Sequence, residues 1–177
     1  MPDSLLPAGI NRVLVTGGAG FIGGAVVRRL LSGSDALVFN LDKCGYASDL
    51  ASIEALPEAK GRHQLLQLDL ADAEATAAAV QQADPDLVMH LAAESHVDRS
   101  IRDPHAFIQT NISGTFSLLE VSRRYYALLN TREKRRFRFH HVSTDEVFGD
   151  CNDFLGPAKE SHRYAPSSPY AASKASA

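Results

Sequence analysis

The chain has 177 residues, which is enough for one domain with a sizeable hydrophobic core. Hydrophobic residues make up 45% of it and charged residues 22%, as in an ordinary globular protein. The net charge of -3 gives no electrostatic reason to expect nucleic acid or an anionic membrane as a partner.

The amino terminus and the cysteines both favour a cytoplasmic protein. Residues 1–11 lack the basic and apolar stretches of a signal peptide. No apolar run approaches the roughly 20 residues that a membrane-spanning helix needs. Cys44 and Cys151 are too few for a disulfide framework and show no metal-ligand spacing, so we expect free thiols and no bound metal.

Short apolar runs alternate with stretches of helical periodicity along the chain. The expected strands cover residues 12–16, 36–41, 64–68, 87–91 and 137–142. The expected helices cover residues 20–31, 73–82, about 104–130 with a break near Gly114, and 169–177. The charged segment 132–138 includes Glu133 and has no companion basic patch, so it is expected to be a solvated loop.

Continuous apolar strands separated by helices indicate a parallel sheet that is covered on both faces. The first strand leads into a turn with glycines at Gly17, Gly20 and Gly23, and a helix follows. Such a turn places backbone amides and a helix amino terminus against a pyrophosphate. The sequence therefore predicts a Rossmann-type doubly wound sheet with a dinucleotide site, in which Phe21 and Ile22 also contact the cofactor.

An acidic residue, Asp42, ends the second strand about 20 residues after the last glycine. Its carboxylate is suited to bind the adenosine ribose and would repel a 2′-phosphate, which favours NAD over NADP. The neighbouring Lys43, also expected at the cofactor, weakens that preference. The other residues expected to line the cofactor site follow the third and fourth strands: Asp69, which could reach the adenine edge, Leu70, Leu91, Ala92 and Ala93.

Tyr170 and Lys174 are four residues apart and therefore lie on one face of the last expected helix. A nearby lysine and the positive nicotinamide ring favour the phenolate, so we expect them to lower the pKa of Tyr170 and make it a usable base. Asp145 and Glu146 follow the fifth strand and suit paired acid and base work, although either could simply cap a turn.

With these motifs in place, the chain resembles the extended short-chain dehydrogenase/reductase family, and within it the dehydratases that act on dTDP-glucose. The segments that carry the resemblance are residues 16–23, 90–100, 143–149 and 169–176. The glycine and Tyr–Lys motifs mark only the broad family, whereas Thr144-Asp145-Glu146 is more specific. Phe148 departs from the tyrosine that is usual there, and we expect little effect on catalysis.

The resemblance implies an NAD-dependent reaction in which a sugar is oxidised, loses water and is reduced again. Tyr170 would take the proton of the sugar 4-hydroxyl, which Thr144 would hold, while Lys174 would bind the nicotinamide ribose. Glu146 would act as base at C5 and Asp145 as acid for the departing 6-hydroxyl. Ser95 and His96 would touch the sugar or its phosphate, although their loop could also serve packing alone.

The resemblance also implies a longer protein, because family members continue well past the Tyr–Lys motif. We therefore expect residues 1–177 to form an incomplete NAD-binding domain without the carboxy-terminal sugar-nucleotide domain, and to have little activity alone. Family dimers pair through the long helix and the Tyr–Lys helix, so the full-length protein is expected to form a homodimer. Two alternatives stay open: another nucleotide-sugar dehydratase, epimerase or decarboxylase, and a non-catalytic nucleotide-binding module.

Overall fold

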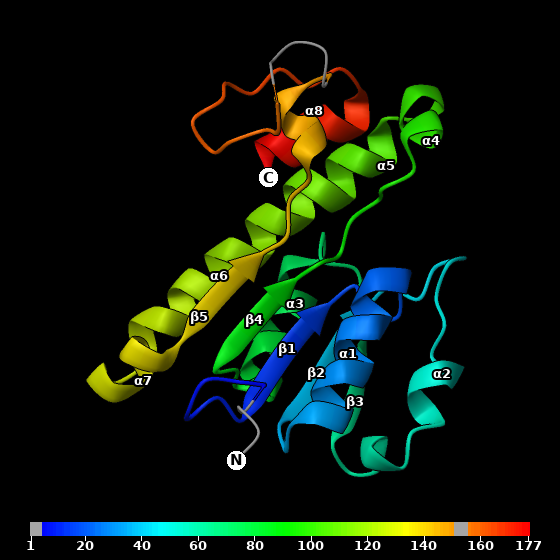
Figure 1. Ribbon diagram of the computed structural model, residues 1–177. Helices are drawn as coiled ribbons and strands as arrows, with labels where there is room; N and C mark the ends of the chain where they lie inside the picture. The colour runs from blue at the N-terminus through cyan, green and yellow to red at the C-terminus, as the bar shows by residue number, and fades with distance from the viewer. Residues whose placement is uncertain (1–4, 151–155) are drawn as a thin grey trace.

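A computed structural model describes residues 5–150 and 156–177 (Figure 1). Its described part contains one sheet, in which every pair of neighbouring strands is parallel. The strands are β1 (Arg12–Thr16), β2 (Leu37–Asp42), β3 (His63–Gln67), β4 (Leu87–His90) and β5 (Arg138–His141). Their order is β3-β2-β1-β4-β5, so the direction of winding reverses between β1 and β4.

The central strand explains why continuous apolar runs predicted a parallel sheet. Val13, Leu14 and Val15 are all fully buried, although successive side chains point to opposite faces of β1. Val13 and Val15 belong to one hydrophobic cluster and Leu14 to another. Both faces of the sheet are therefore covered at its centre.

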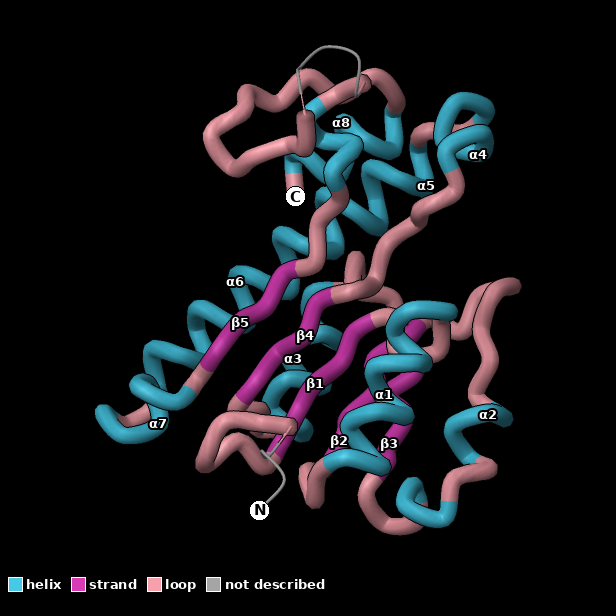
Figure 2. Tube along the Cα trace, in the orientation of Figure 1, coloured by secondary structure: helices cyan, strands magenta, loops and turns pink. Residues whose placement is uncertain are grey.

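Helices supply that cover on both sides of the sheet (Figures 1 and 2). On one face, α1 (Phe21–Gly33) and the short α2 (Ala51–Glu54) pack on β1 and β2. On the other face lie α3 (Ala73–Ala83) and α6 (Thr115–Leu128). The predicted doubly wound Rossmann-type sheet is thus confirmed, with strand ends that differ from the expected ones by at most one residue.

The sequence predicts a break in the long helix near Gly114, but the structure shows that the helix continues through this residue. After α5 (His105–Phe107), a π-helical segment, η2 (Ile108–Gly114), continues directly into α6. Gly114 itself keeps helical angles of φ −64° and ψ −43°. Thr115 and Leu118 are buried just beyond it, and this packing outweighs the weak helix preference of glycine.

The prediction of a loop over residues 132–138 is wrong for most of that range, because the helix α7 (Thr131–Arg136) occupies it. Asn130 caps this helix through the backbone amides of Arg132 and Glu133, and the Glu133 side chain accepts from the Asn130 amide. This reciprocal capping box stabilises even a helix of six residues. Further short elements were also unexpected: α2, α4 (Val97–Arg102) and the 3-10 turn η1 (Pro57–Ala59).

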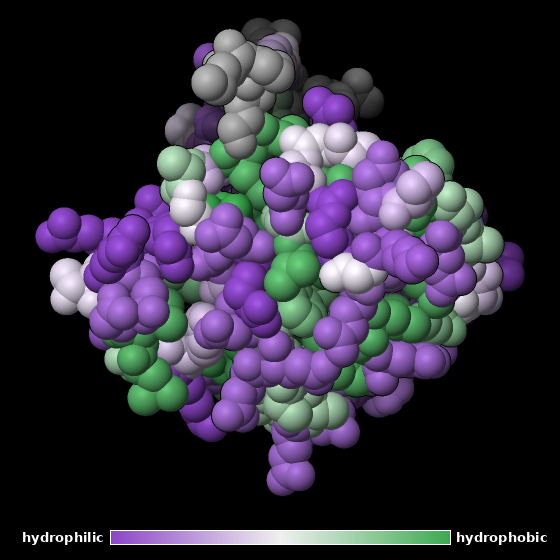
Figure 3. Space-filling model, turned by 90° about the horizontal axis from the view of Figure 1, so that it is seen from below, coloured by the Kyte–Doolittle hydropathy of each residue, from purple (hydrophilic) through white to green (hydrophobic). Residues whose placement is uncertain are grey.

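The carboxyl ends of the strands carry the remaining elements. A 3-10 turn, η3 (Asp145–Phe148), follows β5, and α8 (Pro169–Ser176) packs against it. Figure 1 shows both above the end of the sheet to which the strand arrows point. On the opposite side of the molecule, the surface seen from below is mostly hydrophilic with apolar side chains scattered through it (Figure 3).

Three further expectations concern the thiols, membrane-spanning helices and metal sites. Cys44 is a free thiol, and Cys151 lies outside the described residues. Within the described ranges, no helix combines the length and apolar character required to cross a membrane. The same ranges contain no group of three or more histidine, cysteine or acidic side chains placed to hold a metal ion.

Candidate functional site

A cavity of about 390 Å³ lies at the carboxyl ends of the strands, where the winding reverses between β1 and β4. Open parallel sheets bind ligands at this position. All the residues that the sequence assigned to the cofactor line the cavity: Gly17, Gly20, Phe21, Ile22, Gly23, Asp42, Lys43, Asp69, Leu70, Leu91, Ala92, Ala93, Tyr170 and Lys174. Segments far apart in the chain therefore meet at this one cavity.

The glycine turn connects β1 to α1 along one wall of the cavity. Gly17 has a φ of +72°, and a Cβ atom there would lie 2.7 Å from the Cα atom of Ala92. A Cβ atom on Gly23 would collide with the carbonyl oxygen of Gly17. The backbone can therefore follow this path only with glycine at both positions.

The amino terminus of α1 faces the same cavity. Gly20 is the N-cap residue, and no described side chain caps the helix there. The first amides of the helix are thus available to an anion, and the helix dipole favours negative charge. Phe21 and Ile22 are 94% and 64% exposed beside them.

Asp42 connects the end of β2 with the glycine turn. Its side chain is buried and accepts hydrogen bonds from the amides of Ala19, at 3.0 Å, and Cys44, at 2.7 Å. The Ser48 hydroxyl lies 3.5 Å from the same carboxylate. These donors fix the carboxylate in the cavity wall, and a carboxylate can accept further hydrogen bonds from a ligand.

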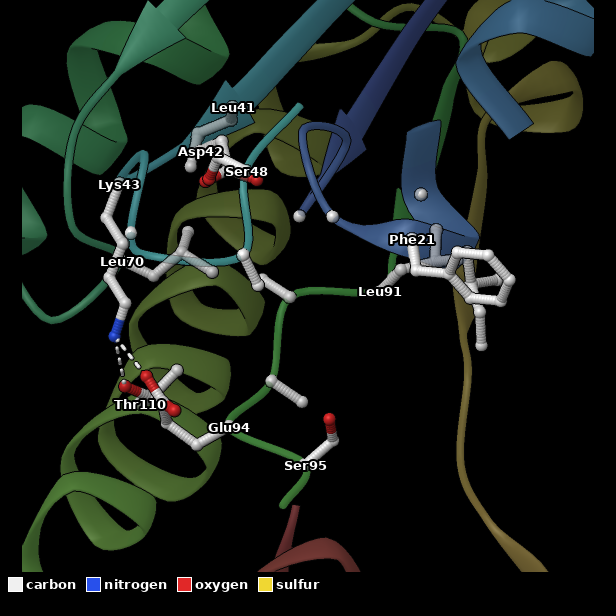
Figure 4. A pocket seen from close by; sticks show the side chains of 18 of the residues that line it. Phe21, Leu41, Asp42, Lys43, Ser48, Leu70, Leu91, Glu94, Ser95 and Thr110 are labelled. Atoms are coloured by element: carbon white, nitrogen blue, oxygen red, sulfur yellow. Dashed lines mark hydrogen bonds and ion pairs between the residues drawn. The ribbon is translucent and has the colours of Figure 1, made fainter. Parts of the chain in front are cut away.

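Lys43 and Glu94 form an ion pair across the cavity (Figure 4). The distance from Lys43 Nζ to Glu94 Oε1 is 2.6 Å, and the Thr110 hydroxyl lies 3.3 Å from the same nitrogen. The pair joins the loop after β2 to the loop after β4.

Tyr170 and Lys174 project from the first turns of α8 and are both buried. Burial raises the pKa of Tyr170, as do Glu146 and Asp145, while the Thr144 hydroxyl acts in the opposite direction. Lys174 Nζ donates to the carbonyl oxygen of Val142 at 2.8 Å, and burial lowers its pKa. In the protein without cofactor the pKa of Tyr170 is therefore raised, not lowered, because burial and two carboxylates outweigh the hydrogen bond with Thr144.

Thr144, Asp145 and Glu146 do not line the cavity, but they lie next to it in η3 beside α8. Both carboxylates act on the pKa of Tyr170, so the triplet and the tyrosine share one site. Thr144, not a carboxylate, caps the turn, because its hydroxyl accepts from the Glu146 amide at 3.3 Å. Neither acid caps the turn, although Asp145 Oδ1 accepts from the Thr144 hydroxyl at 3.4 Å.

The family described as GDP-mannose 4,6 dehydratase matches residues 14–177. The chain belongs to this family. The predicted resemblance to nucleotide-sugar dehydratases is thereby confirmed.

Individual known proteins are also similar to this chain in sequence and fold. A dTDP-glucose 4,6-dehydratase from Shigella flexneri is 51% identical over 173 residues, which cover 93% of this chain and 48% of that protein. A dTDP-glucose 4,6-dehydratase from Streptomyces venezuelae, crystallised with NAD, is 40% identical with a TM-score of 0.80, over 93% of this chain and 48% of that one. A UDP-glucose 4-epimerase from Thermus thermophilus, also in complex with NAD, is 33% identical with a TM-score of 0.75, over 93% and 47%. The chain thus spans about half the length of the relatives it matches.

Ser95 and His96, which were predicted to touch the sugar or its phosphate, are placed differently from each other. Ser95 lines the cavity, whereas His96 is exposed and does not. Several lining residues were missed by sequence reasoning: Leu41, Gly45, Tyr46, Ala47, Ser48, Leu68, Glu94, Thr110, Val142 and Ser143. Most adjoin the carboxyl end of a strand, a position that could have identified them, but Thr110 comes from η2 and has no such local signal.

Two buried polar side chains hold the cavity walls together and were also missed. Asn111, from the π-helical segment, contacts the Glu94 backbone at 2.8 and 2.9 Å and the Ser173 hydroxyl at 2.8 Å. His90 lies 2.7 Å from the Thr16 hydroxyl and 2.8 Å from that of Thr115. Their roles depend on contacts between distant segments, which the local sequence does not reveal.

Proposed function

We propose that the cavity binds NAD and that the protein is a dTDP-glucose 4,6-dehydratase. The observation that carries the proposal is the meeting of three features: the glycine turn, Asp42, and the Tyr170–Lys174 pair with two carboxylates beside it. NAD-bound relatives with the same fold support the choice of cofactor.

The cavity residues fit the parts of NAD by their chemistry. The free amides at the start of α1 would hold the pyrophosphate, and Asp42 would accept from the adenosine ribose hydroxyls. Lys174 would donate to the nicotinamide ribose at the other end. When bound, NAD supplies a ring that takes two electrons from the sugar and later returns them, and its positive charge favours a phenolate nearby.

Tyr170 would take the proton of the sugar 4-hydroxyl, with Thr144 holding that hydroxyl in place. Since burial and the neighbouring carboxylates raise the pKa of Tyr170, the phenolate needs cationic partners in the complete site. Lys174 is the cation that the chain contributes near this tyrosine.

Elimination of water requires a second acid and base, which Asp145 and Glu146 would provide. Oxidation at C4 makes the hydrogen at C5 acidic, so Glu146 would remove it. Asp145 would give a proton to the 6-hydroxyl as it leaves as water. The product after reduction at C6 is dTDP-4-keto-6-deoxyglucose.

The mechanism is tested by replacing Tyr170 with phenylalanine in a full-length protein. Tyr170→Phe should reduce turnover of dTDP-glucose by about 10²–10⁴-fold, the usual contribution of a positioned acid–base group. The measurement is formation of the 4-keto sugar, with Tyr164→Phe, an exposed tyrosine, as the control. Unchanged turnover in Tyr170→Phe would rule out this mechanism.

We also propose that residues 1–177 form an NAD-binding domain and that most sugar-nucleotide contacts come from a further domain. The support is that relatives are about twice as long as the matched region. The 177-residue polypeptide should then bind NAD but turn over little dTDP-glucose. Calorimetric NAD binding together with a product assay tests both statements, and appreciable turnover would refute the second.

A different nucleotide-sugar enzyme is the second candidate, because a UDP-glucose 4-epimerase shares the fold at 33% identity. The adjacent Asp145 and Glu146 favour dehydration, since an epimerase eliminates no water. Assaying a full-length protein with dTDP-, UDP-, CDP- and GDP-sugars, for product and for water loss, distinguishes these enzymes. Absence of turnover with all of them would favour a non-catalytic nucleotide-binding module.

A homodimer of the full-length protein is proposed as well. Apolar side chains are exposed along the long helix at helical spacing: Ile108 (47%), Phe116 (65%), Leu119 (42%) and Tyr126 (42%). Such a stripe is typical of a helix that packs against another helix. Phe116→Glu should shift a dimer toward monomer in analytical ultracentrifugation, and an unchanged sedimentation profile would argue against this interface.

A further inference from the structure

Lys43 follows Asp42 directly in the chain, yet its side chain points away from the Asp42 carboxylate. Figure 4 shows it extending toward Glu94 and Thr110, whereas Ser48 lies near the carboxylate. Its ammonium group contacts Glu94 Oε1 at 2.6 Å and the Thr110 hydroxyl at 3.3 Å. The cation next to the predicted ribose site is therefore held by partners on the far wall of the cavity.

This arrangement bears on the choice between NAD and NADP. A 2′-phosphate would sit beside the adenosine ribose, where Asp42 repels it and a free cation would attract it. The cationic side chains among the described lining residues are Lys43 and Lys174. Lys174 lies near Tyr170 and donates to the carbonyl oxygen of Val142, so Lys43 is the lining cation that adjoins Asp42.

We propose that Glu94 sets the preference for NAD over NADP by holding Lys43 away from the ribose end of the cavity. The inference rests on the proposed NAD site and deepens it. Asp42 repels the additional phosphate, and Glu94 withholds the cation that would compensate for that repulsion.

Glu94 is well placed to act in this way because its position does not depend on its own side chain. Its backbone amide donates to the Asn111 side chain at 2.8 Å, and its carbonyl oxygen accepts from the same side chain at 2.9 Å. The Glu94 side chain is only 17% exposed, against 39% for Lys43. A substitution of Glu94 should therefore release Lys43, whose flexible four-carbon chain can reorient, without moving the loop.

The test is the affinity of the chain for NAD and for NADP, measured by isothermal titration calorimetry. Glu94→Gln should tighten NADP binding relative to NAD by about tenfold, the order expected for one charge-assisted hydrogen bond. Glu94→Asp keeps the charge but is one methylene shorter, so it should shift the ratio less, in the same direction. Glu120→Gln removes a carboxylate on α6 outside the cavity lining and should leave the ratio unchanged.

A double variant separates release of Lys43 from simple loss of negative charge. Adding Lys43→Met to Glu94→Gln should remove the gain in NADP affinity. An unchanged ratio in Glu94→Gln, or a gain that survives in the double variant, would overturn the proposal. Failure of the unsubstituted chain to bind NAD would instead overturn the proposed function, and it would be seen before any variant is compared.

Discussion

At the scale of single residues, the neighbours Gly23 and Gly24 differ sharply in what surrounds them. A Cβ atom at Gly23 meets the backbone of the glycine turn, whereas one at Gly24 meets the movable end of Arg28 at 3.2 Å. Gly23→Ala should therefore destabilise the fold by about 1–3 kcal/mol and weaken NAD binding. Gly24→Ala should be neutral or stabilising by about 0.5–1 kcal/mol, because alanine is the better helix former. Urea unfolding and NAD titration check both, and equal effects of the two substitutions would contradict this account.

At the scale of elements, His90 connects β1, β4 and α6. It is 1% exposed, and its ring nitrogens contact hydroxyls that can donate or accept, so either tautomer of the neutral ring is satisfied. Burial, with smaller effects of His141 and Lys174, lowers the pKa of His90 to about 3. The buried surroundings of His90 and its two hydroxyl contacts therefore favour the uncharged form of its ring.

The lowered pKa of His90 predicts a pH-dependent stability. The unfolded chain takes up a proton near the ordinary histidine pKa of about 6.5, whereas the folded protein does so only near 3. The contribution is therefore fully present above about pH 6.5 and is lost as the pH falls toward 3. About 2 kcal/mol of this stabilisation is lost when the pH falls from 7 to 5.

The measurement is the free energy of unfolding in urea at pH 7 and pH 5. The loss on acidification should be smaller in His90→Gln, which keeps a polar side chain that does not titrate, than in the unsubstituted chain. Exposed His105 provides the matched control, because His105→Gln should keep the original loss. Identical losses in all three proteins would show that His90 is not the source.

At the scale of the whole molecule, the cavity lies where the carboxyl ends of all five described strands converge. A ligand bound there contacts the folded arrangement and has no equivalent site in the unfolded chain. If the cavity binds NAD, free NAD at 100 times its dissociation constant should raise the free energy of unfolding by about 2.7 kcal/mol. Urea unfolding with and without NAD measures this, and nicotinamide mononucleotide, which lacks the adenosine half, is the control at equal concentration. No increase with NAD would contradict the site.

Local sequence patterns predict the parallel sheet and most of the residues that line the cavity. The reason is that both follow from local patterns: continuous apolar strands, glycines after the first strand, and an acidic residue at the end of the second. Because parallel strands bring their carboxyl ends to one edge, residues such as Asp42 and Ala92 could be assigned to one site without coordinates.

How the side chains in that site are partnered depends on contacts between segments that are distant in the sequence. The ion pair between Lys43 and Glu94 joins loops 51 positions apart in sequence, and no local pattern predicts which cation meets which carboxylate. The direction in which the pKa of Tyr170 moves in the protein without cofactor likewise depends on burial and on acids from another element, which the Tyr–Lys spacing does not reveal. Continuity of the long helix past Gly114 was set by packing on the sheet, which outweighs local preference because buried contacts are worth more than intrinsic helix propensity.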